Sequence, residues 1–140
     1  MNTKRLTIRF EDVDAAHASE LTESLKNWLS DDAMVAQPAP GDPKVRIEPG
    51  HNPDAQGSPT LLMIDVLLAS TVHGVAMPAL HPFTSRLWNS IQRWWIMNGE
   101  PPVVFETAGS AKRSLRKSSD ARKREMLEKV REMIELLETQ

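Results

Sequence analysis

The chain has 140 residues, of which 40% are hydrophobic and 26% are charged, and its formal net charge at pH 7 is −2. This length and composition are typical of one globular domain with a single core. Because the chain contains no cysteine, disulfides, thiolate metal sites and cysteine nucleophiles are excluded. The small net charge provides no overall field toward nucleic acid or anionic lipid. Residues 1–10 lack the apolar core of a secretory signal, so we expect a cytoplasmic protein.

The first thirty residues predict a strand followed by an amphipathic helix. Leu6, Ile8 and Phe10 alternate with polar residues, which is the period of a strand with one buried face. Asp14 is placed to cap the helix, because its carboxylate can accept hydrogen bonds from free backbone N–H groups. The apolar spacing of the helix continues to about Leu29.

The middle of the chain predicts a short strand between two irregular segments. Prolines make residues 37–43 a connection, Val45 and Ile47 then alternate in a strand, and residues 50–59 are dense in turn-forming residues. The most apolar stretch of the chain, residues 61–77, follows. We expect it to be a buried core helix, because it is shorter than the ~20 residues that span a membrane and contains Asp65 and His73.

A further helix is expected over residues 84–98, because apolar residues recur there at helical spacing. Gly99 suits its C-cap, and two prolines follow. Adjacent tryptophans cannot point the same way, so at least one of Trp94 and Trp95 is expected to leave the core. Exposed tryptophans are typical of the energetic centres of protein interfaces. The apolar stripe consists of Leu87, Ile91, Trp94 and Trp95, with Trp88 at its margin.

The last third of the chain predicts a strand, a basic segment and an amphipathic helix. The strand covers residues 103–107, and the helix from residue 125 onward has Met126, Val130, Met133 and Leu137 on one face. Residues 109–124 are expected to be a solvated linker or a docking arm for an acidic protein surface, and phosphate binding is a third interpretation. Their basic residues are Lys112, Arg113, Arg116, Lys117, Arg122, Lys123 and Arg124.

These elements predict an α+β fold in the order β-α-β-α-α-β-α. A small mixed sheet of about three strands would pack with three helices, and a C-terminal amphipathic helix would follow. We expect residues 1–108 to form a compact interaction domain, residues 109–124 to be a basic linker, and residues 125–140 to be the C-terminal helix.

Motifs for catalysis and cofactor binding are absent from the sequence. It contains no phosphate-binding loop, dinucleotide fingerprint, nucleophile elbow or zinc-protease motif. Its four histidines have no spacing that would join them as ligands. We therefore predict no catalytic residue, no cofactor and no metal site.

With these elements in place, residues 5–108 resemble the bacterial effector-associated constant component domains. The resemblance rests on the segments RLTIRF, ELTESLKNWLSDD, KVRIEP, LLMIDVLLASTVHGVAM, SRLWNSIQRWW and PVVFE. Such domains are small adaptor-like modules, fused to or encoded beside proteases, NTPases and other effectors of bacterial conflict and immunity systems. The resemblance thus implies a partner protein and no catalytic position.

The function that we expect is that of a non-enzymatic adaptor in bacterial antiviral defence. It would form a homo-oligomer or recruit an effector such as a protease or NTPase. One alternative is a membrane-active effector that inserts residues 61–77 and the tryptophan-rich helix, and another is nucleic-acid binding through residues 110–124. The candidate partner-binding residues are Leu61, Leu62, Leu68, Trp88, Trp94, Trp95, Met133 and Leu137.

Overall fold

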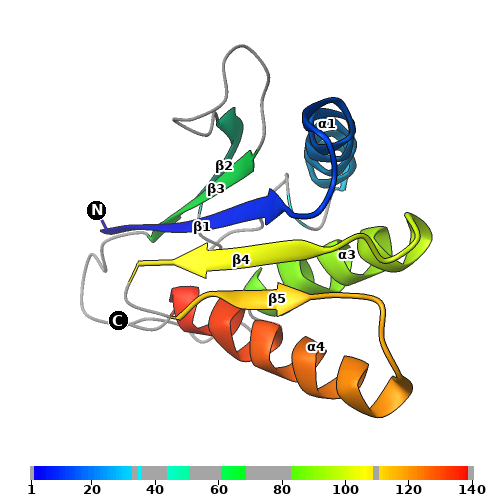
Figure 1. The fold of residues 1–140 in the computed structure, drawn as a ribbon. Helices are drawn as coiled ribbons and strands as arrows, with labels where there is room; N and C mark the ends of the chain where they lie inside the picture. Colours follow the sequence, from blue (N-terminus) through cyan, green and yellow to red (C-terminus); the bar gives the residue numbers. More distant parts are fainter. Residues whose placement is uncertain are drawn as a thin grey trace.

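The computed structural model confirms the α+β class and describes residues 2–32, 35, 44–50, 61–68, 83–108 and 111–138. Its strands form one antiparallel sheet in the order β2-β3-β1-β4-β5 (Figure 1). The strands are β1 (Asn2–Phe10), β2 (Lys44–Gly50), β3 (Leu61–Leu68), β4 (Val103–Thr107) and β5 (Arg113–Leu115). The helices are α1 (Ala15–Asp31), α3 (Phe83–Met97) and α4 (Asp120–Glu135), and the 3-10 turn η1 (Leu136–Glu138) follows α4.

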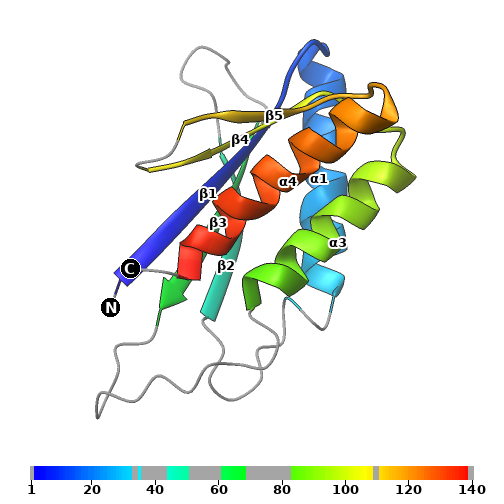
Figure 2. The same ribbon diagram turned by 90° about the horizontal axis from the view of Figure 1, so that it is seen from below.

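The three helices α1, α3 and α4 lie on one side of the sheet (Figure 2). Side chains alternate along a strand, so alternate residues of β1 and β3 point toward these helices, and six of them are buried. These core residues are Leu6, Ile8, Phe10, Leu62, Ile64 and Val66. The opposite side of the sheet, which none of the described helices covers, is called the helix-free face below.

The helix α1 begins where the sequence predicts it. The backbone N–H of His17 donates to Asp14 Oδ1 at 2.7 Å, so Asp14 is the expected N-cap. The buried stripe Ala18, Leu21, Leu25 and Leu29 then faces the sheet and α3. Capping and amphipathic spacing thus determine this helix locally.

The helix α3 is buried over a wide arc because it contacts the sheet, α1 and α4 at once. The ring centroids of Trp94 and Phe10 in β1 are 5.6 Å apart, and those of Trp88 and Phe105 in β4 are 6.3 Å apart. Trp94 and Trp95 are both buried. The expectation that one of them leaves the core is therefore wrong: they point in different directions, but both directions are covered.

Residues 61–68 are a strand, which corrects the prediction of a helix over residues 61–77. In LLMIDVLL, Leu62, Ile64 and Val66 face the helices, whereas Leu61, Met63 and Leu67 are half-buried on the helix-free face. A strand that is apolar on both faces has no polar alternation, so its pattern resembles that of a buried helix. Residues 69–77, most of the predicted loop 50–59 and the predicted connection 37–43 lie outside the described residues.

The described part of residues 109–124 belongs to the folded unit, which corrects the prediction of a linker. Strand β5 pairs with β4, with Leu115 opposite Val103, and α4 begins at Asp120 rather than at residue 125. Val130, Met133 and Leu137 are buried against the same core, as predicted for one face of this helix. The sheet therefore has five strands instead of about three, and the C-terminal helix is one of its covering helices.

The end of α3 gives a first testable prediction. Gly99 has φ +85°, and a Cβ added there would meet no heavy atom within 4 Å, so only the backbone conformation favours glycine. We expect Gly99→Ala to lower the free energy of unfolding by about 1 kcal/mol, measured by urea denaturation. Ala108→Gly, at an exposed position outside the strands, is the control. An unchanged stability of Gly99→Ala would contradict the left-handed C-cap.

Candidate functional site

Most of the predicted partner-binding side chains lie in the core of the folded chain. Six of the eight have exposed fractions of 3% or less, which corrects the prediction that they form a contact surface. Leu61 is half-buried on the helix-free face, and the side chain of Leu68 lies outside the described part of the structure. The six buried residues are Leu62, Trp88, Trp94, Trp95, Met133 and Leu137.

Hydrogen bonds explain why three of the tryptophans can be buried or half-buried. The indole N–H of Trp95 donates to the carbonyl of Pro101 at 2.8 Å, and that of Trp94 donates to Ser24 Oγ in α1 at 3.0 Å. Trp28 Nε1 lies 3.0 Å from both acceptors of Ser90 in α3. Because a buried N–H without a partner is costly, these acceptors make the tryptophans structural residues of the helical layer.

Apart from the singly exposed Ile96, Met97 and Leu136 of the helical layer, partly exposed apolar side chains lie together on the sheet. On the helix-free face, Leu61, Met63 and Leu67 of the interior strand β3 form a half-buried stripe, which we call the β3 stripe. The exposed charged residues Arg46 and Glu48 of the edge strand β2 lie beside it. Only Leu61 of the three is among the predicted partner-binding residues, because these positions share a face in a strand but not in the helix expected there.

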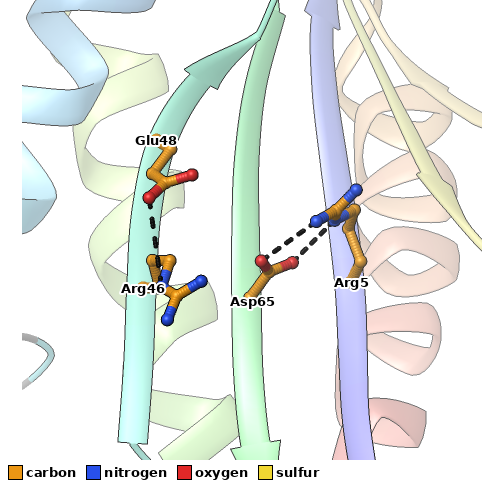
Figure 3. A network of polar contacts seen from close by, with 4 residues as sticks. All are labelled: Arg5, Arg46, Glu48 and Asp65. Atoms are coloured by element: carbon orange, nitrogen blue, oxygen red, sulfur yellow. Dashed lines mark hydrogen bonds and ion pairs between the residues drawn. The ribbon is translucent and has the colours of Figure 1, made fainter.

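An ion pair crosses the helix-free face and interrupts the β3 stripe, because Asp65 lies between Met63 and Leu67 on the same face of β3 (Figure 3). Arg5 of β1 lies directly opposite Asp65 of β3, and its Nε and Nη2 donate to the two carboxylate oxygens at 2.7 and 3.1 Å. The Asp65 side chain is only 8% exposed, whereas that of Arg5 is 55% exposed. The hydrogen bonds to Asp65, followed by its charge, raise the pKa of Arg5 above its ordinary value. Arg5 thus supplies the partner that a buried carboxylate needs.

Part of the basic segment is neutralised by acidic groups of the domain. Arg116 donates to Asp12 Oδ2 at 2.7 Å and to Glu11 Oε2 at 3.0 Å, and these two carboxylates raise its pKa, chiefly through the hydrogen bond to Asp12. Lys123 Nζ lies 2.7 Å from Glu100 Oε1. Arg116 thus connects the loop before α4 to the loop before α1, and Lys123 connects α4 itself to the loop before β4. The segment is therefore anchored at both of these points.

Lys112 is also paired, at the border of the helix-free face. Its Nζ lies 2.9 Å from Glu106 Oε1 of β4. Both residues line a hollow of about 380 Å³, together with Arg5, Thr7, Thr107 and Ala108. The charged groups of this hollow are Arg5, Lys112 and Glu106, and each of them already has an ion-pair partner. The hollow therefore presents no unbalanced charge to a ligand.

At the β5 edge of the sheet, in contrast, some basic side chains have no carboxylate partner among the described residues. A second hollow, of about 360 Å³, lies between β5 and the first half of α4, and we call it the β5–α4 groove. Arg113 and Arg122 line it and have no ion pair among the described residues, whereas Lys129 pairs with Glu125 at 3.4 Å. The groove is lined by Lys112, Arg113, Ser114, Arg122, Glu125, Met126 and Lys129.

The structure also bears on metal ligation and membrane crossing. Within residues 2–32, 35, 44–50, 61–68, 83–108 and 111–138, no group of three histidine or carboxylate side chains is placed to hold a metal ion. No helix in the same part of the chain is both long and apolar enough to cross a membrane. His51, His73 and His81 lie outside the described ranges.

Comparison with models of protein families, with curated proteins and with solved structures finds no match for this chain.

Proposed function

We propose that this chain is a non-enzymatic protein–protein interaction module that uses its helix-free face to bind a second copy of itself or an effector protein. The observation that carries the proposal is the β3 stripe, Leu61, Met63 and Leu67, on a sheet face that the described helices leave uncovered. Partly exposed apolar side chains in an ordered strand are a ready contact surface, because a partner can remove their remaining area from water.

The surroundings of the β3 stripe support the same proposal. Charged side chains of the flanking strands, Arg5 of β1 and Arg46 and Glu48 of β2, lie beside the stripe (Figure 3). An apolar centre with a polar, solvent-accessible rim is the usual anatomy of a protein interface. The charges on both sides of the stripe would set the register of a partner surface, since like charges opposite one another are unfavourable.

The identity of the partner is proposed from the resemblance of residues 5–108 to effector-associated constant component domains. A module of that kind would join an effector such as a protease or an NTPase to a bacterial antiviral or conflict system, and it would form a homo-oligomer in the process. The β3 stripe lies within this range, and residues 111–138 add β5 and α4 to the same folded unit.

The β3 stripe gives a direct test of this function. We expect Met63→Glu to weaken self-association, or binding to the effector, by about tenfold or more, because it places a charge at the apolar centre of the contact. Self-association is measured by sedimentation velocity over a concentration series. Binding to an effector is measured by photo-crosslinking from residue 63 in cells.

Met97→Glu is the matched control, because Met97 is an apolar residue that is 70% exposed at the end of α3, on the opposite layer of the fold. It should leave association unchanged, and thermal unfolding should show that both variants are folded. A wild-type chain that is monomeric at all concentrations and forms no more crosslinks from residue 63 than from residue 97 would overturn the proposal.

A further inference from the structure

The β5–α4 groove combines an unbalanced positive charge with a free strand edge. Four cations line it, Lys112, Arg113, Arg122 and Lys129, against the single carboxylate of Glu125. Glu106 neutralises Lys112 and Glu125 neutralises Lys129, so the guanidinium groups of Arg113 and Arg122 remain without an ion pair among the described residues. A ligand with two negative charges would complete this charge balance.

Strand β5 forms one wall of the groove and ends the sheet. It pairs with β4 on one side and with no described strand on the other. An edge strand presents backbone N–H and C=O groups that another extended chain can pair with. Arg113 and the buried Leu115 are on the side of β5 that faces α4, so the free edge runs directly beside a basic side chain.

We propose that the β5–α4 groove binds an extended, acidic segment of a partner protein, which adds to the sheet as a strand beside β5. Its backbone would pair with the free edge, as in other cases of strand addition. Its carboxylates would accept hydrogen bonds from Arg113 and Arg122. Alternate side chains of a strand share one face, so acidic residues at every second position would all point toward α4.

Two observations favour a peptide over a nucleic acid as the occupant. A free strand edge offers alternating donors and acceptors that match a peptide backbone, and a phosphodiester chain has no donors with which to answer them. In the second half of α4, Arg131 is paired with Glu128 and Glu135, so no unpaired cation continues the groove along the helix, and Glu132 would repel a phosphate there. The half-buried Met126 in the groove offers an aliphatic contact between the charged ones.

The test uses the full chain and a fluorescent peptide of about ten residues, the upper length of ordinary strands, that alternates glutamate and valine. We expect Arg113→Glu with Arg122→Glu to weaken binding by at least about tenfold, because two charge-assisted contacts become repulsive. Lys117→Glu with Arg124→Glu is the matched control, since it makes the same charge change at exposed residues that do not line the groove. The control should bind within about twofold of the wild type.

Two modified peptides separate the charge contribution from the backbone contribution. Replacing glutamate by glutamine should abolish binding, and N-methylation of alternate residues should do the same because it removes the N–H groups that pair with β5. Equal losses in the two double variants, undiminished binding of either modified peptide, or no binding of the unmodified peptide would overturn the proposal. It would also be overturned if single-stranded DNA displaced the peptide and bound more tightly through Arg113 and Arg122.

This inference rests on the proposed function only in taking a protein as the ligand, and it uses a different surface. Met63→Glu should leave peptide binding in the groove unchanged, and Arg113→Glu with Arg122→Glu should leave self-association unchanged. If the wild-type chain binds the peptide but does not associate through the helix-free face, the proposed function has failed. If it associates through that face but does not bind the peptide, this inference has failed.

Discussion

Replacing Trp95 by alanine is expected to lower the free energy of unfolding by about 3–5 kcal/mol, which is more than we expect for any substitution on the surface. The Trp95 side chain is 1% exposed, and its indole N–H donates to the carbonyl of Pro101 at 2.8 Å. Truncation leaves a large cavity in the helical layer and an unpaired carbonyl in the turn before β4. Urea denaturation followed by circular dichroism measures the loss.

Two variants control this prediction. Trp95→Phe keeps most of the buried ring and removes the hydrogen bond, so it should cost about 1–2 kcal/mol. Ile96→Ala changes the adjacent residue, which is 52% exposed, and should cost less than about 1 kcal/mol. If Trp95→Ala kept full stability and lost only association, the side chain would be an interface residue after all, and the buried position would be wrong.

The second large effect is expected at the ion pair between Arg5 and Asp65. Arg5→Ala should lower the free energy of unfolding by about 1–3 kcal/mol, because it leaves a carboxylate that is 8% exposed without a counter-charge. The value is below that of a fully buried pair because Arg5 is 55% exposed and water can approach the site. Asp65→Ala should cost less, because the released guanidinium can extend into water.

The exposed pair in Figure 3 is the control. Arg46 Nε lies 3.9 Å from Glu48 Oε1, and the two side chains are 61% and 55% exposed. Arg46→Ala should therefore change the free energy of unfolding by less than about 0.5 kcal/mol. The hydrogen bonds to Asp65 raise the pKa of Arg5 above an already high value, so the contribution of Arg5 is fully present at neutral pH and is lost on the alkaline side only as the pH rises through its folded-state pKa. The difference between the wild type and Arg5→Ala should therefore be constant from about pH 6 to 9. Equal effects of Arg5→Ala and Arg46→Ala would contradict the role of burial.

Elements with a local cause could be predicted well. The cap at Asp14, the alternation of Leu6, Ile8 and Phe10, and the left-handed Gly99 each depend on residues only a few positions apart. Their hydrogen bonds and steric limits are nearly the same in any fold. For such elements the sequence is a sufficient guide.

The candidate surface could not be predicted in the same way. Arg5 and Asp65 are 60 positions apart, and only the register between β1 and β3 places them opposite each other. Strand alternation places Met63 and Leu67 on the same face as Leu61, and only the packing of the helices decides that this is the helix-free face. The one signal in the sequence is Asp65 within an apolar run, which requires a partner but does not name it.

The basic segment shows the same division. Its seven cations are evident from the sequence, and a linker is the simplest interpretation of them. Pairing of β5 with β4 adds three residues to the sheet, and Arg116 and Lys123 pair with carboxylates of other segments. Only the tertiary structure shows that Arg113 and Arg122 line the β5–α4 groove and, unlike the other cations there, have no ion pair among the described residues.

By itself, the sequence determined the α+β class, the capped first helix, the stripe of the C-terminal helix and the missing cysteine chemistry, because these depend on composition and local spacing. The tertiary structure decided that residues 61–68 are a strand, that Trp94 and Trp95 are buried, and that Leu61, Met63 and Leu67 form a half-buried stripe on the helix-free face. The physical reason is that hydropathy indicates which residues avoid water, whereas the layer that covers each of them is set by strand pairing and helix packing between distant segments.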